Sequence, residues 1–291
     1  MPTLENARCR VQVSPRGAEL TSFQLDGLEY LWQADPAHWG RHAPLLFPIV
    51  GRLPDDTYLH QGQSYKLPQH GFARDQEFQL IHADARRLEF LLLASEATRA
   101  VFPFEFDLRV GYELRGTELT VRWRVRNPAA SGRELLFSIG AHPAFRCPLE
   151  ADEQFEEYYF EFDHPVQLRR HLLRGGRRTG ETQPVPLENN GTELPFSAAL
   201  FADDALVFSH YDFTCLTLRA RRSARAVRLR FDGFPYLGLW TKSAAAGFVC
   251  VEPWHGVASA VGPPQELADK EGILALAPGA EFVASYSLAI S

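Results

Sequence analysis

The chain has 291 residues, of which 45% are hydrophobic and 23% charged, and its formal net charge is −6. This composition is typical of a globular protein, and the negative charge argues against a nucleic-acid or anionic-membrane partner. We expect no signal peptide, and no apolar run approaches the roughly 18 residues of a membrane span. The four cysteines are scattered without a CxxC spacing, which favours a reducing cytoplasm.

Short segments of alternating polarity predict β-strands along most of the chain. In chain order, strands are expected at Leu88–Leu93, Phe106–Leu114, Leu119–Arg126, Tyr158–Phe162, Leu216–Arg219, Val227–Arg230, Tyr236–Thr241 and Phe282–Ile290. The pattern is clearest in 119–126, where Leu, Val, Trp and Val form one face. Arg174–Glu193 is expected to be a long loop over the sheet. A short helix is predicted near Pro264–Lys270, where proline can occupy the first turn.

Many short strands with alternating faces predict an all-β fold, namely a large antiparallel sandwich. No linker composition divides the chain, so residues 1–291 are expected to form one domain. The arginines on the outer strand faces are expected to be solvated, with a phosphate-binding patch as the alternative. They are Arg122, Arg124, Arg126, Arg228 and Arg230.

Two ionisable residues interrupt apolar strand segments. Glu252 lies within Val249–Trp254, and an isolated buried carboxylate is costly unless it is paired or hydrogen-bonded. His142 is followed by Pro143, which cannot donate to a central ladder and therefore predicts the imidazole at a sheet rim. A carboxylate and an imidazole brought together are what proton transfer requires. A histidine bonded to a backbone carbonyl is the structural alternative for His142.

Two loop segments offer polar ligands. Arg52 follows an apolar segment, Pro48–Val50, that reads as a strand and would deliver the arginine to a loop rim. There its fork of donors can hold an oxygen-rich ligand, unless it is an ordinary surface residue. His70 precedes Gly71, which permits an irregular backbone and the close approach of a ligand, although a loop histidine can also be merely exposed.

Acidic and aromatic residues lie near the strand that carries Glu252. Asp203 and Asp204 precede an apolar strand, either as turn residues or with one of them accepting hydrogen bonds from sugar hydroxyls; Asp204 is the candidate because it lies nearer the strand. Trp240 is expected on a strand beside Glu252, where its ring would suit the C–H face of a carbohydrate or simply fill the core.

The sequence disfavours several other kinds of active site. It contains no HExxH or HxH spacing, so no metal site is predicted. It contains no Gly-x-Ser-x-Gly elbow and no glycine-rich phosphate loop, which disfavours a serine hydrolase and a nucleotide-dependent enzyme.

Taken in order, six segments resemble the aldose 1-epimerase (mutarotase) family, and in particular its LacX-like branch. They are PLLFPIVGR (44–52), HGFAR (70–74), GAHPAF (140–145), DDALVF (203–208), LGLWTK (237–242) and VEPW (251–254). The resemblance spans about residues 5 to 290 and implies a galactose-mutarotase-like β-supersandwich with a sugar cleft across one sheet.

The resemblance also implies roles for individual residues. Glu252 would be the general base and His142 the general acid. The sugar oxygens would be held by His70, Arg52 and an aspartate around 204. The sequence departs from the better-known galactose enzymes after both His-Gly and His-Pro, so the identity of the substrate does not carry over.

We therefore expect a cytoplasmic aldose 1-epimerase that needs no cofactor, binds a hexose or hexose phosphate, and is a monomer or homodimer. One alternative is a hexose-6-phosphate mutarotase, which needs basic residues at one end of the cleft; Arg74 and Lys242 are the candidates. A second is a non-catalytic sugar-binding or regulatory protein. A third is a sandwich-type glycosidase or lyase, although a glycosidase usually uses two carboxylates.

Overall fold

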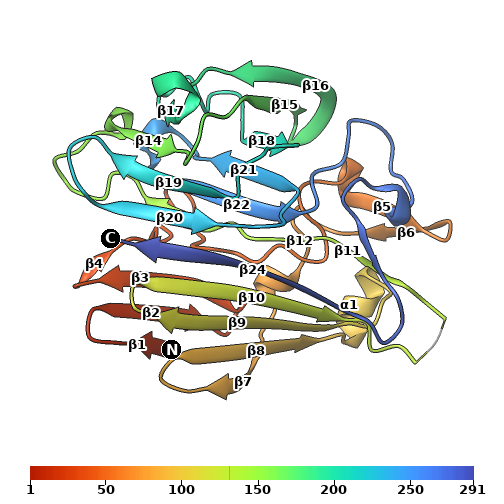
Figure 1. Cartoon of the computed structure of the whole chain (residues 1–291). Helices are drawn as coiled ribbons and strands as arrows, with labels where there is room; N and C mark the ends of the chain where they lie inside the picture. The colour runs from red at the N-terminus through yellow and green to blue at the C-terminus, as the bar shows by residue number, and fades with distance from the viewer. Residues whose placement is uncertain (131) are drawn as a thin grey trace.

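The computed structural model describes residues 1–130 and 132–291 and consists mainly of antiparallel strands (Figure 1). The largest sheet has nine strands in the order β17 (Glu193–Pro195), β14 (Tyr158–Glu161), β19 (Cys215–Ala220), β20 (Ala226–Arg230), β24 (Glu281–Ile290), β10 (Glu118–Arg126), β9 (Asp107–Arg115), β8 (Arg87–Leu93) and β7 (Gln79–Ala83). The predicted all-β fold is confirmed.

A seven-stranded sheet lies above it in Figure 1. Its order is β12 (Ile139–Gly140), β22 (Phe248–His255), β21 (Tyr236–Trp240), β18 (Leu206–Ser209), β15 (Leu168–Arg174) and β16 (Arg177–Val185), with β13 (Ala144–Arg146) also paired to β22. Smaller sheets join β1 (Thr3–Glu5), β2 (Cys9–Ser14), β3 (Glu19–Leu25) and β4 (Leu28–Glu29); β5 (Thr57–His60) and β6 (Gln63–Lys66); and β11 (Leu135–Phe137) and β23 (Leu274–Leu276).

Helical segments are short. The α-helix is α1 (Glu96–Val101), which begins with a capping box between Ser95 and Thr98 and was not predicted. Near the predicted helix at 264–270 there is only a 3-10 turn, Leu267–Asp269. The other 3-10 turns are Pro54–Asp56, Ala73–Asp75, Phe155–Glu157, Asn189–Gly191 and Ala244–Ala246. Within the described ranges, no helix is long and apolar enough to cross a membrane.

Two further predictions about local structure were wrong. Much of 174–193 is not a loop: β15 and β16 form a hairpin in which Arg174 pairs with Arg177. Most side chains of β16 are exposed, so apolar alternation is absent and the usual strand signal is missing. The apolar segment before Arg52 is not a strand, because Leu46 and Phe47 make only isolated bridges, to Gly140 and Gly71.

The main core lies on the inner faces of the two large sheets. In β10, Leu119, Val121, Trp123 and Val125 are buried, while the alternate residues face outward. On β22, Val249 and Val251 belong to the same core. The other face of β22 is also covered, by a separate aromatic cluster around Phe248 and Cys250. Because β22 is covered on both faces, a polar side chain on it is buried wherever it points.

Candidate active site

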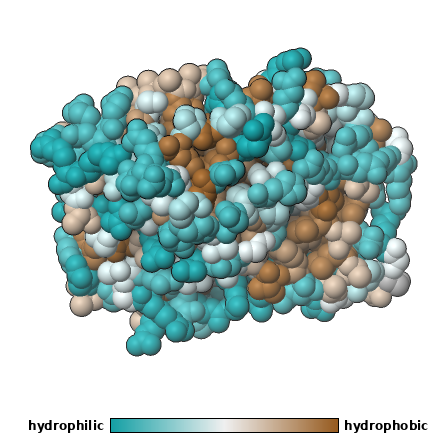
Figure 2. Space-filling view, turned by 45° about the horizontal axis from the view of Figure 1, so that its top comes forward, coloured by the Kyte–Doolittle hydropathy of each residue, from teal (hydrophilic) through white to brown (hydrophobic). Residues whose placement is uncertain are grey.

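A cleft of about 540 Å³ lies on the face of the seven-stranded sheet opposite the main core. This side comes forward in Figure 2, where apolar surface shows between hydrophilic side chains. The cleft brings together eight of the candidate residues that the sequence singled out, and Asp203 is not among its lining residues. The eight residues are Arg52, His70, Arg74, His142, Asp204, Trp240, Lys242 and Glu252.

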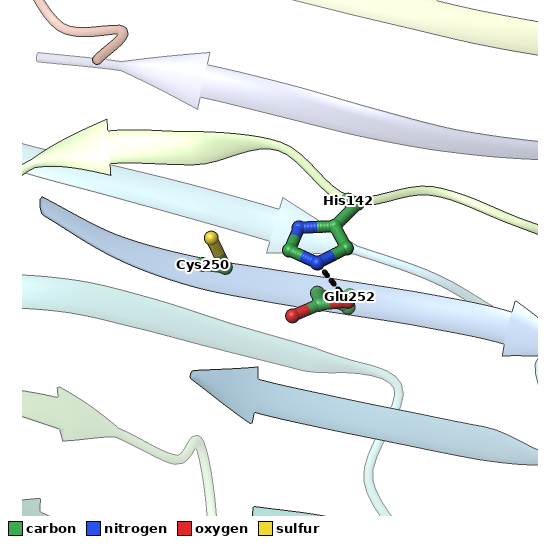
Figure 3. Close-up of side chains that lie close together, drawn as sticks. All are labelled: His142, Cys250 and Glu252. Carbon is green, nitrogen blue, oxygen red and sulfur yellow. Dashed lines mark ion pairs between the residues drawn. The ribbon is translucent and has the colours of Figure 1, made fainter. Parts of the chain in front are cut away.

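Glu252 occupies the centre of the cleft floor. Its strand, β22, pairs with β21, so that Glu252 lies opposite Gly238. The side chain is only 2% exposed, and Oε2 lies 3.1 Å from Nε2 of His142 (Figure 3). Burial raises the pKa of the Glu252 carboxyl well above its ordinary value, and the negative charge of Asp204 adds to the effect.

His142 reaches Glu252 from the link between β12 and β13 at the edge of the sheet. The backbone N–H of Ala141 donates to the carbonyl of Pro253, which anchors this link to β22. Burial lowers the pKa of the imidazole well below its ordinary value. The other ring nitrogen, Nδ1, is buried and has no hydrogen-bond partner among the described residues.

The close pair of Glu252 and His142 can share one proton. A protonated carboxyl beside a neutral imidazole and a carboxylate beside an imidazolium hold the same number of protons. The raised pKa of Glu252 and the lowered pKa of His142 both favour the uncharged pair in the buried site. A substrate that hydrogen-bonds to both groups could carry the proton from one to the other.

His70 can donate a hydrogen bond from Nε2, which also lies 3.3 Å from the side-chain amide of Gln69. Its Nδ1 accepts a hydrogen bond of 3.1 Å from the backbone N–H of Gly51, so the neutral ring carries its proton on Nε2. Burial, followed by the nearby His142, lowers the pKa of His70 and keeps it neutral. Gly71 beside it has a positive φ of 71°, and a Cβ there would lie 2.3 Å from the Phe47 carbonyl oxygen.

The cationic side chains of the cleft differ in how far other groups of the protein already bind them. Arg74 is partly engaged by the protein: Nη2 donates to the Gln69 carbonyl at 2.7 Å, whereas the buried Nε lies 3.8 Å from Asp75 and has no hydrogen-bond partner among the described residues. Burial lowers the pKa of Arg74 to about 10. Arg52 has a long hydrogen bond of 3.4 Å to the carbonyl of Gly175, and its side chain is otherwise exposed. Lys242 is exposed and makes no ion pair with the part of the chain that the structure describes.

The two adjacent aspartates point to different surroundings. Asp203 accepts a hydrogen bond of 3.1 Å from Arg170, whereas Asp204 lines the cleft. Asp204 has a φ of 105°, and its Oδ1 accepts the N–H of Ala205 at 2.7 Å. Asp204 therefore lines the cleft from an irregular turn, and Asp203 faces Arg170 instead.

The cleft contains tryptophans as well as polar groups. Trp240 is partly buried at the end of β21, and its ring centroid lies 5.7 Å from that of His142. Trp254 is 6% exposed, and its indole N–H donates to the Ala141 carbonyl at 3.1 Å. Its ring occupies space left by glycines at 140 and 238. These rings give the cleft apolar surfaces beside its polar ones.

Trp39 and Arg178 are among the lining residues that were not predicted from the sequence. Trp39 lies in a loop without strand periodicity, and nothing near it in the sequence signals a contact with His142. Arg178 lies on β16, within the segment that was taken for a loop. Its guanidinium forms a two-pronged ion pair with Glu271, at 2.9 and 2.6 Å, and Nε donates to the Ala258 carbonyl.

Metal ligation is the other chemistry that this group of residues could support. Candidate ligand atoms of His142, Cys250 and Glu252 all lie within 4.8 Å of one another (Figure 3). A metal binds the thiolate form of cysteine, yet burial raises the pKa of the Cys250 thiol well above its ordinary value. Cys250 also packs in the aromatic cluster, so we assign it to packing.

Comparisons with known proteins identify the family of the chain. The family model described as Aldose 1-epimerase matches residues 2–271. The chain is 33% identical over 296 residues to the chromosomal Protein LacX of Lactococcus lactis subsp. lactis, covering 99% of this chain and 98% of that protein.

Solved structures with the same fold include two from lactobacilli. A galactose mutarotase related enzyme from Lactobacillus acidophilus has a TM-score of 0.92 and 34% identity, covering 99% of this chain and 96% of that one. A galactose mutarotase-like protein from Lactobacillus casei has a TM-score of 0.92 and 30% identity, with complete coverage of both chains. The expected galactose-mutarotase-like fold is therefore confirmed.

Proposed function

The chain belongs to the aldose 1-epimerase family, and from that premise we propose that it interconverts the α and β anomers of a hexose. The reaction would proceed by acid–base opening and closure of the sugar ring. The observation that carries the proposal is the 3.1 Å contact between Glu252 and His142 at the floor of the cleft. Binding a sugar without turnover does not require such a pair.

In the proposed ring opening, the Glu252 carboxylate removes the proton from the anomeric hydroxyl. The bond between C1 and the ring oxygen breaks, C1 becomes an aldehyde carbon, and His142 gives its proton to the departing ring oxygen. Rotation about the C1–C2 bond presents the other face of the aldehyde, and closure runs the two proton transfers in reverse. Each half-reaction moves one proton between the two groups, so the active site is restored.

Burial favours the uncharged form of the pair, so the ion pair that begins this cycle is the less populated form, and burial makes the two groups of that form more reactive. The raised pKa of Glu252 makes it a stronger base than an exposed carboxylate, and the lowered pKa of His142 makes its imidazolium a stronger acid. Acid–base assistance of this kind is worth roughly 10²–10⁴-fold in rate. Spontaneous mutarotation is not very slow, so an enhancement of that size would suffice.

The surrounding groups fit the task of holding the sugar. We assign His70 as a donor to a sugar oxygen through its Nε2 proton, since Nδ1 is already occupied by Gly51. Asp204 would accept hydrogen bonds from hydroxyls, and Arg52 would donate to an oxygen at the rim. The rings of Trp240 and Trp254 would contact the C–H face of the sugar.

The chemistry needs only proton transfer, so we propose no cofactor. A small sugar is the partner that the cleft accommodates. We place the reaction in the cytoplasm, because the four cysteines are all buried free thiols, as a reducing compartment favours.

A phosphorylated hexose is the second candidate substrate. It is favoured by Lys242, which lines the cleft without an acidic partner among the described residues, and by the weakly engaged Arg52. Arg74 is less suited to bind phosphate than expected, since its guanidinium is mostly buried and Nη2 already donates to the Gln69 carbonyl. A 6-phosphate would place two negative charges near these cations.

The proposal is tested by following the relaxation of pure α-anomers of glucose, galactose and their 6-phosphates by polarimetry or NMR. We expect wild type to accelerate relaxation of at least one sugar, and Glu252→Gln and His142→Asn to abolish the acceleration while remaining folded. Binding without acceleration of any sugar would instead indicate a non-catalytic sugar-binding protein. Release of cleavage products from an oligosaccharide would indicate a glycosidase.

A further inference from the structure

The loop that follows β4 carries a tryptophan, Trp39, which lines the cleft but has no role in the acid–base proposal. Both ends of this loop are tied to β13, since Trp32 donates its N–H to the Ala144 carbonyl and His42 accepts the Ala144 N–H. Within the loop, the indole N–H of Trp32 donates to the Trp39 carbonyl at 2.9 Å. The Trp39 N–H donates to Asp35 at 2.8 Å. These bonds hold Trp39 in a defined place above the sheet.

The indole of Trp39 lies nearly flat on the imidazole of His142. The ring centroids are 4.9 Å apart and the planes differ by 26°. The rings of Trp240 and His70 approach the same imidazole at steep angles, each with a centroid distance of 5.7 Å. Trp39 in turn stacks on Phe248 at 5.5 Å, which joins it to the aromatic cluster on β22.

This packing takes the place of a hydrogen bond that an acid–base histidine usually has. Such histidines are commonly oriented by a carboxylate or carbonyl at the nitrogen that does not react. Here Nε2 faces Glu252, while Nδ1 is buried and has no partner among the described residues. Within residues 1–130 and 132–291, the imidazole is therefore oriented by the Glu252 contact at Nε2 and by ring packing, in which Trp39 provides the parallel contact.

We propose that Trp39 is a positioning residue for the acid–base pair, holding the His142 imidazole toward Glu252 and keeping water from one face of the ring. The inference rests on the proposed epimerase function and extends it to a loop residue. Trp39 acts through His142 and moves no proton itself.

The charged and titratable groups around His142 define what removal of the indole would change. Glu252 and Cys250 approach from β22, and His70 approaches from its own loop. The positive charges of Arg74 and Arg41 also act on the imidazole. Because burial is the largest cause of the lowered pKa of His142, admitting water to its face would raise that pKa toward the ordinary value.

The test compares Trp39→Leu, which removes the aromatic face, with Trp39→Phe, which keeps one. Phe248→Leu is the matched control, since it disturbs the same aromatic cluster one ring further from His142. For each protein, kcat and KM are measured across pH, and the His142 ring is titrated by NMR in the absence of sugar. The full-length chain is used throughout.

We expect Trp39→Leu to lower kcat by about tenfold or more with a much smaller change in KM, since small misplacement of a reacting group is costly. The acidic limb of kcat/KM and the His142 titration should both move to higher pH, and Trp39→Phe should restore most of kcat. A rise in KM alone, an unmoved titration, or equal effects of Phe248→Leu would overturn the inference.

The two proposals can fail separately. If wild type accelerated no sugar, the epimerase proposal would fail. The NMR titration of His142 in Trp39→Leu would still show whether the indole controls the environment of this ring. If wild type were active and the titration did not move, only the positioning role would be lost.

Discussion

The indole ring of Trp254 lies so close to Gly238 that a Cβ atom added at position 238 would come within 2.5 Å of its Cη2 atom. The two residues belong to the neighbouring strands β22 and β21. Gly140 leaves room for the other side of the ring, because a Cβ there would lie 2.4 Å from Cδ1 of Trp254. The floor of the cleft is therefore shaped by glycines on both strands that flank β22.

Gly238→Ala should displace the Trp254 ring from the floor of the cleft. We expect a severalfold rise in KM, a loss of kcat because the added Cβ would also lie 3.3 Å from the Cβ of Glu252, and a loss of about 1–3 kcal/mol in the free energy of unfolding, as for other overpacked sites. Gly111→Ala is the control, because a Cβ there meets only ordinary contacts at 3.8 Å. Steady-state kinetics and urea unfolding measure these effects; an unchanged KM in Gly238→Ala would contradict the proposed sugar contact.

The pH dependence of kcat/KM should be bell-shaped, because the Glu252–His142 pair works while it holds one shared proton. The raised pKa of Glu252 delays loss of that proton as the pH rises, and the lowered pKa of His142 delays gain of a second as the pH falls. The plateau should therefore extend below the ordinary histidine pKa of about 6.5. A rate that falls on acidification already at this value would show that His142 titrates as an exposed histidine.

Glu252→Gln should gain stability relative to wild type as the pH rises. Between the ordinary carboxyl pKa and the raised value of Glu252, the folded protein keeps a proton that the unfolded chain releases, so the free energy of unfolding falls with pH. The glutamine variant has no such proton to keep, so its free energy of unfolding should not fall in this way. Relative to wild type, it should gain on the order of 1 kcal/mol between pH 5 and pH 8. Urea unfolding at both pH values measures it, and a constant difference would contradict the raised pKa.

Lys242→Gln should distinguish phosphorylated from neutral substrates. If Lys242 binds a phosphate, the substitution should raise KM for a hexose 6-phosphate by about threefold to tenfold and leave KM for the free hexose nearly unchanged. The same rates at higher salt should show a weaker preference, since the lysine is exposed. Equal effects on both sugars would remove the support that Lys242 gives to the phosphorylated candidate.

Features of this structure could be predicted from the sequence where a pattern within one segment indicated them. The hairpin of β9 and β10 follows from the strict alternation of apolar and polar residues, and its nine residue pairs continue to the turn at 115–118. Glu252 and His142 were identifiable because each breaks an apolar segment. The hairpin of β15 and β16 was missed because its outer strand is mostly exposed, so its sequence reads as a loop.

Contacts between distant segments had no local signal. Trp39 meets His142 only because the loop after β4 folds over β22, and the sequence near Trp39 shows no periodicity that predicts this. The choice between Asp203 and Asp204 likewise depended on tertiary structure, since Arg170 on β15 binds the first and leaves the second at the cleft. Such assignments need the arrangement of the sheets, which alternation alone does not specify.

The most direct test of the account is the rate of anomer exchange for Glu252→Gln beside a matched glutamate substitution away from the cleft. Glu89→Gln serves as the control, since Glu89 is also largely buried but binds Arg87 and Arg124 on the nine-stranded sheet. Exchange measured by NMR should fall by about 10²-fold or more in Glu252→Gln and remain near wild type in Glu89→Gln. Full activity of Glu252→Gln would contradict the acid–base role of the buried pair.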